Sequence, residues 1–217
     1  MIRRVIGSIG VLLMSCVPAA ATSITVGGAS INDQGQFTTV AGAQTIDFNA
    51  LAGGIQSFTQ GIAAYTNVNI FTCATCTGTG DLLDDTTTAA RASGGGTYAI
   101  DFSAPIYYFG LYWGSPDADN VLTFYNAGTP LFSFTGANLM SGFGVPGGLS
   151  GAAYVNFFAS PGDSPATRIV FSGGQFPFES DNHAFSTVPS TVPEPTSLVL
   201  LATGGVGLLA RRRKRQQ

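Results

Sequence analysis

The 217-residue sequence has few charged side chains, and its middle has almost no cations. Between residues 22 and 191 the only cations are Arg91 and Arg168, against eleven Asp and Glu residues, so the net charge of this region is near −9. A nucleic-acid-binding surface needs a basic footprint. The composition therefore excludes nucleic acid as a partner and suits a soluble body or one that holds divalent cations.

Histidine is also scarce, and His183 is the only one in the sequence. Asp181 and Glu179 lie beside it, and Ser180 and Ser186 are nearby hydroxyls for a Ser-His-Asp site. The plainer interpretation is a histidine at the surface or at a strand edge. Nothing in the sequence marks a pair of glycosidase carboxylates either. We therefore expect a protein that is not an enzyme, with a secreted hydrolase as the remote alternative.

Cysteine is equally rare. Besides one in the N-terminal segment, the chain has Cys73 and Cys76 in a CxxC spacing. In an oxidising compartment we expect these two to form a structural disulfide. A redox pair would need a helix that begins at Cys73, whereas Thr and Gly surround it. A zinc site would need a second pair of ligands.

The N-terminus has the pattern of a secretory signal peptide. Two arginines precede an apolar run at residues 5–14, and a run of alanines ends at Ala21. We expect residues 1–21 to direct export through the Sec machinery and to be cleaved after Ala21. A lipobox-like stretch at residues 13–16, which would make Cys16 a lipidated N-terminus, is the alternative.

The C-terminus contains an uncharged apolar segment at residues 197–210. As a helix it would cover roughly 20 Å of a bilayer core about 30 Å thick. We therefore expect a short transmembrane helix that holds the chain in the membrane only briefly. The cations that follow should stay in the cytoplasm, which places the acidic body outside. That basic cluster comprises Arg211, Arg212, Arg213, Lys214 and Arg215.

The order of motif, helix and basic cluster resembles the PEP-CTERM sorting signal of Gram-negative bacteria. The motif itself is Val192, Pro193, Glu194 and Pro195, and the signal spans residues 192–217. The same tail is also known as the "ice-binding protein C-terminal" domain. The resemblance to the sorting signal implies an exosortase as partner and a route through the inner membrane to the cell surface or extracellular matrix. An ordinary tail anchor is the alternative. Ice binding is not favoured, because the threonines show no regular array.

The part between the two ends, residues 22–186, predicts one all-β domain, followed by a Thr/Pro linker at 187–191. Short alternating runs are separated by turns about every ten residues, which is typical of a β-sandwich. A long Thr/Gly/Asp stretch at 73–96 should form a binding or mobile loop. No helix is expected between the two ends. Strands are predicted at 23–28, 44–49, 68–72, 97–103, 106–113, 121–126, 131–135, 154–158, 167–172 and 178–185.

This region has a second, weaker resemblance, to exosortase-dependent surface proteins with a jelly-roll, lectin-like sandwich. It covers roughly residues 44–186 and implies a fold but no ligand. The stretches that carry it are residues 109–115, 121–126, 154–157 and 178–184.

Two further ligand sites are considered, one for Ca²⁺ and one for sugar rings. Clustered carboxylates suit Ca²⁺, and the candidates are Asp81, Asp84, Asp85, Asp117 and Asp119. Tyr112 and Trp113, with Tyr107 and Tyr108 before them, could stack on sugar rings, although aromatic residues in such an apolar run more often form core. The sequence thus predicts an exported structural or adhesive protein of exopolysaccharide or biofilm, or else a carbohydrate-binding module.

Overall fold

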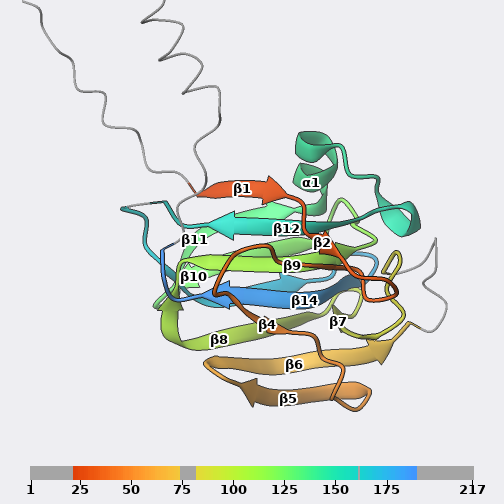
Figure 1. Cartoon of the computed structure of the whole chain (residues 1–217), viewed down its shortest axis with the longest axis horizontal. Helices are drawn as coiled ribbons and strands as arrows, with labels where there is room; N and C mark the ends of the chain where they lie inside the picture. The colour runs from red at the N-terminus through yellow and green to blue at the C-terminus, as the bar shows by residue number, and fades with distance from the viewer. Residues whose placement is uncertain (1–21, 74–81, 161, 190–217) are drawn as a thin grey trace, which may run out of the picture.

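The structure is a computed structural model that describes residues 22–73, 82–160 and 162–189. It is built almost entirely of antiparallel strands (Figure 1), so the all-β prediction is confirmed. The strands are β1 Ser23–Val26, β2 Ala29–Ser30, β3 Gln36–Phe37, β4 Gln44–Ile46, β5 Gly54–Gln60, β6 Ala63–Thr72, β7 Thr88–Ala92, β8 Thr97–Ile106, β9 Tyr108–Gly114, β10 Val121–Asn126, β11 Thr129–Thr135, β12 Ala152–Phe158, β13 Ala166–Ser172 and β14 Phe178–Ser186.

Twelve strands form one curled sheet instead of two separate sheets. Along the path, the order is β1-β12-β9-β14-β7-β6-β8-β13-β10-β11, with β4 beside β14 and β5 beside β6. Strands β2 and β3 make a separate small hairpin. The sheet curls into a half-barrel, so strands β12, β9 and β14 of one half face β8, β13 and β10 of the other.

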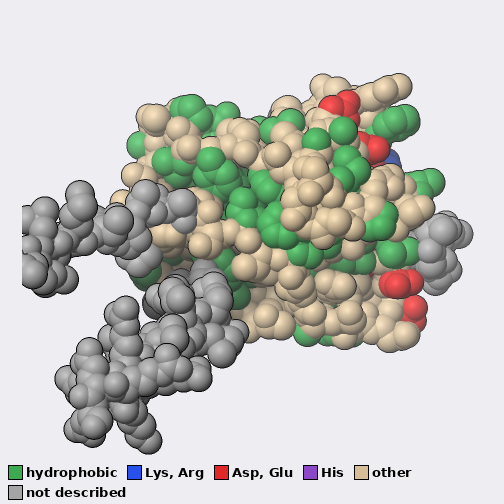
Figure 2. All heavy atoms as spheres, turned by 90° about the horizontal axis from the view of Figure 1, so that it is seen from above, with side chains coloured by type: hydrophobic (Ala, Val, Ile, Leu, Met, Phe, Trp, Pro, Cys, Tyr) green, Lys and Arg blue, Asp and Glu red, His purple; other side chains and the backbone are tan. Residues whose placement is uncertain are grey.

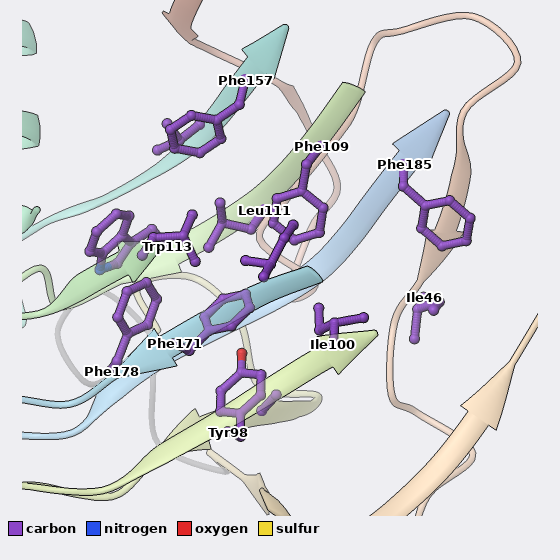
Figure 3. Close-up of a cluster of buried hydrophobic side chains, with 14 of the residues drawn as sticks. Ile46, Tyr98, Ile100, Phe109, Leu111, Trp113, Phe157, Phe171, Phe178 and Phe185 are labelled. Atoms are coloured by element: carbon purple, nitrogen blue, oxygen red, sulfur yellow. The ribbon is translucent and has the colours of Figure 1, made fainter. Parts of the chain in front are cut away.

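Aromatic side chains fill the space between the two halves (Figure 3). Trp113 of β9 stacks on Phe178 of β14, with ring centroids 4.2 Å apart. Phe171 of the opposite half lies edge-on to both Phe109 and Phe178. Aromatic residues bury large areas and dominate core energetics. The curled shape therefore follows from closing a sheet around these rings.

Most of the expected strands are present, and the run at 106–113 is a strand buried on both faces, as predicted. Three differences stand out. Strand β8 continues through Pro105, which is exposed where the pairing with β13 is irregular. The expected long loop at 73–96 contains β7, a strand of small residues around Arg91, which is stable because it lies between β6 and β14.

The third difference is a helix where we expected none. Helix α1, Gly136–Phe143, follows β11. Thr135 caps its N-terminus together with Asn138 in a capping box, and Gly144 ends it in the left-handed conformation, with φ at 69°. The helix buries little more than Leu139, which explains why no apolar stripe predicted it.

No helix among the described segments is long and apolar enough to cross a membrane. The expected signal peptide at 1–21 and the sorting signal at 192–217, with its apolar segment, lie outside those segments. Of the linker, residues 187–189 are described, and they are exposed.

Candidate functional site

Strand β14 is the centre of the polar chemistry in the described structure. It pairs with β9 along one edge and with β7 and then β4 along the other, and all nine of its residues are buried. Five consecutive polar residues occupy its middle, and each must find a partner, because a buried polar group without a hydrogen bond is costly. They are Glu179, Ser180, Asp181, Asn182 and His183.

A β-bulge at Asn182 divides these residues between the two faces of the sheet. Asp181 lies opposite Tyr112 of β9, but the next paired residue is Ala184, opposite Gly110. Asn182 takes a left-handed conformation with φ at 51°. Because the extra residue reverses the alternation, His183 shares the inner face with Ser180, while Asp181 points to the outer face.

The inner-face network consists of Tyr65, Tyr98, Ser180 and His183. The Nε2 atom of His183 lies 2.9 Å from the Ser180 hydroxyl, and its Nδ1 atom lies 2.9 Å from the Tyr65 hydroxyl. Tyr98 lies 3.0 Å from the same serine oxygen. The imidazole stacks on Phe171. Burial lowers the pKa of His183 from 6.5 to about 3, so the ring is neutral at physiological pH.

This geometry corrects two expectations. The histidine is fully buried and not at the surface or at a strand edge. The serine and the histidine of the considered Ser-His-Asp site do meet, but Asp181 lies on the other face, and Ser186 hydrogen-bonds to Val188. Since Ser180 and His183 are both 0% exposed, no substrate can reach the pair in this conformation.

The outer-face network joins two buried carboxyl groups, Asp85 and Asp181, through Thr87. The Thr87 hydroxyl lies 2.6 Å from Asp85 Oδ1 and 3.2 Å from Asp181 Oδ2. Backbone N–H groups also donate to each acid, from Thr87 to Asp85 Oδ1 and from Asn182 to Asp181 Oδ1. Asp85 Oδ2 is buried and has no hydrogen-bond partner among the described residues.

A raised pKa at Asp181 accounts for the burial of two carboxyl groups side by side. Burial, and secondly the Asp85 carboxylate, hold the pKa of Asp181 well above its usual value of 3.8. A protonated Asp181 can donate from Oδ2 to the Thr87 hydroxyl, which in turn donates to Asp85 Oδ1. The two hydrogen bonds then run in one direction, from Asp181 through Thr87 to Asp85.

Two segments cover this network, residues 29–37 and residues 82–87. The side-chain amide of Asn182 donates to the carbonyls of Gln34 and Gln36, and Gln34 forms a β-bridge with Asp85. Gly35 is essential to the close approach, because a Cβ atom there would overlap the ring of Tyr112. The Tyr112 hydroxyl donates a hydrogen bond to the Leu83 carbonyl, which links β9 to the covering segment at residues 82–87.

A polar pocket of about 420 Å³ opens beside this cover. Hydroxyl, amide and carboxylate groups line it around one edge of the Tyr112 ring. Burial, and next the carboxylates of Asp85 and Asp84, raise the pKa of Tyr112 far above 10, so the hydroxyl keeps its proton. The pocket is thus a set of hydrogen-bonding groups beside an aromatic edge. Its lining residues are Ser30, Ile31, Asn32, Asp33, Gly35, Gln36, Asp84 and Tyr112.

The carboxylates considered for calcium fall into separate places. Asp85 is committed to the buried pair, whereas Asp84 is exposed at the pocket. Asp119 accepts from the Gln175 backbone in the turn after β9, where partial burial and then Asp119 raise the pKa of Asp117. No three metal-ligating side chains meet in the part of the chain that the structure describes. Asp81 lies outside that part, so calcium stays a prediction.

The aromatic candidates divide between core and pocket. Trp113 is 0% exposed, so the expectation that it could stack on sugars is wrong, and the alternative of a core residue holds. Tyr112 is 3% exposed and offers the pocket only an edge. Tyr108 is buried against Phe158. Cys73 is disulfide-bonded, and its expected partner, Cys76, lies outside the described residues.

Sequence reasoning missed the pairing of Asp85 with Asp181 and the roles of Thr87 and Asn182. The continuous polar run at 179–183 inside an apolar strand was the available signal, since such a run cannot alternate between core and solvent. It does not reveal the bulge, because the bulge depends on the register with β9.

Comparison with protein families matches residues 191–214 to the PEP-CTERM protein-sorting motif, which confirms the resemblance seen in the sequence. No curated protein matches the chain. Among solved structures, the chain is similar to the catalytic unit of a thermostable GH87 alpha-1,3-glucanase from Streptomyces thermodiastaticus strain HF3-3, at 13% identity and a TM-score of 0.38. The likeness covers 70% of this chain but 27% of the glucanase, and at this score it carries no argument.

Proposed function

From the PEP-CTERM protein-sorting motif at residues 191–214, which indicates an exosortase-sorted surface protein, we propose a non-enzymatic structural or adhesive role in exopolysaccharide or biofilm. The motif is the observation that carries this proposal. An acidic β-sheet body between two apolar ends suits a protein that Sec exports, that is held briefly in the inner membrane and that remains at the cell surface or in the matrix.

The polar pocket beside Tyr112 supports a glycan contact. Sugars offer many hydroxyl groups, and the pocket presents carboxylate, amide and hydroxyl partners around an aromatic edge. Its volume falls within the range usual for small-ligand sites. The curled antiparallel sheet is also consistent with the lectin-like body that the second resemblance implies.

The buried Ser180–His183 pair supports the non-enzymatic part of the proposal. A general base must come within hydrogen-bond reach of its substrate, and Ser180 and His183 are both 0% exposed. The acids of the outer network, Asp85 and Asp181, are likewise 0% exposed and are linked to each other through the Thr87 hydroxyl.

Mass spectrometry of protein recovered from outside the cell tests the sorting proposal. We expect an N-terminus at Thr22 and a C-terminus near residues 193–195, because both ends should be processed during export. The matched control is a chain with Pro193→Ala and Pro195→Ala, which should remain cell-associated with its C-terminus intact. Recovery of wild-type chains that retain residues 1–21 inside the cell would refute the proposal.

The second candidate function is a carbohydrate-binding module with a defined glycan, and the polar pocket is what favours it. A glycan array should then show saturable binding that Asp33→Ala weakens. Asp47→Ala is the matched control, because Asp47 is also exposed but lies outside the pocket. Equal, non-saturating binding to all glycans would remove this candidate and leave the structural role.

A further inference from the structure

An apolar slot lies where the two free edges of the curled sheet approach each other. Strands β1 and β11 end the path of the sheet, and Ile24 of β1 and Leu131 of β11 line one cavity of about 430 Å³. Three phenylalanine rings in its lining contact one another: Phe132 stacks on Phe124 with ring centroids 4.4 Å apart, and Phe157 is tilted against Phe124 at 5.0 Å.

The slot is open, and most of its lining is apolar, with Thr22, Asp163 and Ser164 as the polar members. Leu131 is 36% exposed, and Ile24 and Phe132 are half-buried. Figure 2, which looks down on the side where Figure 1 shows β1 and α1, shows a group of hydrophobic side chains near the middle of this face, among polar side chains and backbone. Exposed apolar patches of this kind mark sites that another surface or segment covers.

The described chain ends beside this slot. The backbone N–H of Tyr107, whose side chain lines the slot, donates to the carbonyl of Ser186, three residues before the last described residue. Thr22, the first described residue, lines the slot as well. The residues that follow 189 therefore start within reach of its mouth.

We propose that the slot binds the apolar segment of the same chain, residues 197–210, whenever that segment is not in a membrane. Seven residues, 190–196, connect the described body to the segment and can span at most about 25 Å. A tether of this length gives a high effective local concentration, in the millimolar range. The segment is uncharged and rich in Leu and Val, which matches the aromatic and aliphatic residues that make up most of the lining.

This binding would give the chain two alternative places for one apolar segment. In the membrane the segment would serve as the sorting handle, and in water the slot would remove part of its apolar surface from solvent. The inference does not depend on cleavage at residues 193–195. It needs only that the segment is still attached to the body.

Photo-crosslinking in the full chain tests the proposal. A benzoylphenylalanine placed at Leu200, in detergent-free buffer, should crosslink to Ile24, Leu131 or Phe132, as mapped by mass spectrometry. The same probe at Gln217, beyond the basic cluster, is the control and should give scattered products. Mixing isotope-labelled and unlabelled chains separates contacts within one chain from contacts with a second copy.

Matched substitutions then test specificity. Leu131→Asp should reduce slot crosslinks roughly tenfold, because a charged group replaces an apolar contact. Leu149→Asp, at an exposed leucine outside the slot, should leave them unchanged. Leu201→Glu in the tail should have the same effect as Leu131→Asp without altering the body, so a folding defect cannot explain the loss.

Three outcomes would overturn the inference. They are crosslinks between labelled and unlabelled chains, crosslinks scattered over the body, and slot crosslinks that persist in both Leu131→Asp and Leu201→Glu. The first would assign the slot to a second copy. Failure of processing in the cell, by contrast, would refute the sorting proposal and leave this result unaffected.

Discussion

The two faces of β14 carry buried polar networks that solve the same problem in opposite ways. On the inner face, His183 is neutral because burial has lowered its pKa to about 3, and hydroxyl groups bond to both ring nitrogens. On the outer face, burial and then a neighbouring carboxylate raise the pKa of Asp181 well above its usual value, which favours its neutral form. Burial thus favours the neutral form of a base on the inner face and the neutral form of an acid on the outer face.

This contrast teaches that the two networks should fail at opposite ends of the pH scale. A group whose pKa is lowered by folding favours the unfolded state as the pH falls, since the unfolded chain then binds the extra proton. A carboxyl group whose pKa is raised by folding favours the unfolded state as the pH rises. The folded protein therefore depends on acid-sensitive packing inside and base-sensitive pairing outside.

The largest effect on stability should come from His183→Ala, which removes the central residue of the inner-face network. The substitution removes a fully buried ring that stacks on Phe171, takes away the His183 partner of the Tyr65 hydroxyl and leaves Ser180 with Tyr98 as its remaining partner. We expect the free energy of unfolding to fall by about 3–5 kcal/mol, measured by urea denaturation. Phe176→Ala, at an exposed phenylalanine, is the control and should change it by less than about 0.5 kcal/mol. A loss equal to that control would show that the network contributes nothing.

The outer cover should be the next most sensitive part. Gly35→Ala adds a Cβ that overlaps the Tyr112 ring at a backbone with φ at 67°, so we expect a loss of about 2–4 kcal/mol in the free energy of unfolding. Gly42→Ala shares the left-handed conformation, with φ at 76°, but meets open space. The difference between the two losses isolates the steric overlap. Equal losses would show that the cover does not press on Tyr112.

Asp181→Asn should separate the pH responses of the two networks. In the wild-type protein, Asp181 lowers the free energy of unfolding by up to about 1.4 kcal/mol for each pH unit above 3.8, until its raised pKa is reached. His183 lowers it by a similar amount for each unit from 6.5 down to about 3. The variant should lose the decline at high pH and keep the decline in acid.

Urea denaturation at a series of pH values measures both slopes. Asp47→Asn is the matched control, since this exposed acid lies outside the network and should leave the high-pH slope intact. If wild type and Asp181→Asn show the same dependence on pH throughout the range above 3.8, the raised pKa of Asp181 is ruled out.

The smallest effect should come from removing the bridging hydroxyl. Thr87→Val leaves the volume nearly unchanged but breaks the link between Asp85 and Asp181, which should cost about 1–2 kcal/mol in the free energy of unfolding. Thr86→Val, which loses a longer, exposed hydrogen bond to the Asp33 carbonyl, is the control and should cost less. Equal thermal unfolding of the two variants would argue against the relay.

Much of the fold was predictable because its strands have local patterns. The alternation at 97–103 and the apolar run at 106–113 gave β8 and β9, and Trp113 follows the rule that aromatic residues in such a run form core. Strand β7 was not predictable, because alanines have no preference for strands and this one is stable only between its neighbours. Helix α1 was missed because it depends on its caps.

The sequence by itself determined the sorting signal of this protein and the class of its fold. A sorting motif works as a linear string of residues, and alternating apolar residues bury one face of a strand whatever the sheet order. Only the tertiary structure decided which polar groups meet. Simple alternation would place Asp181 and His183 on the same face, but one extra residue at Asn182 separates them. Such a bulge arises from pairing with β9, which lies 70 residues earlier in the chain, so no local pattern can encode it.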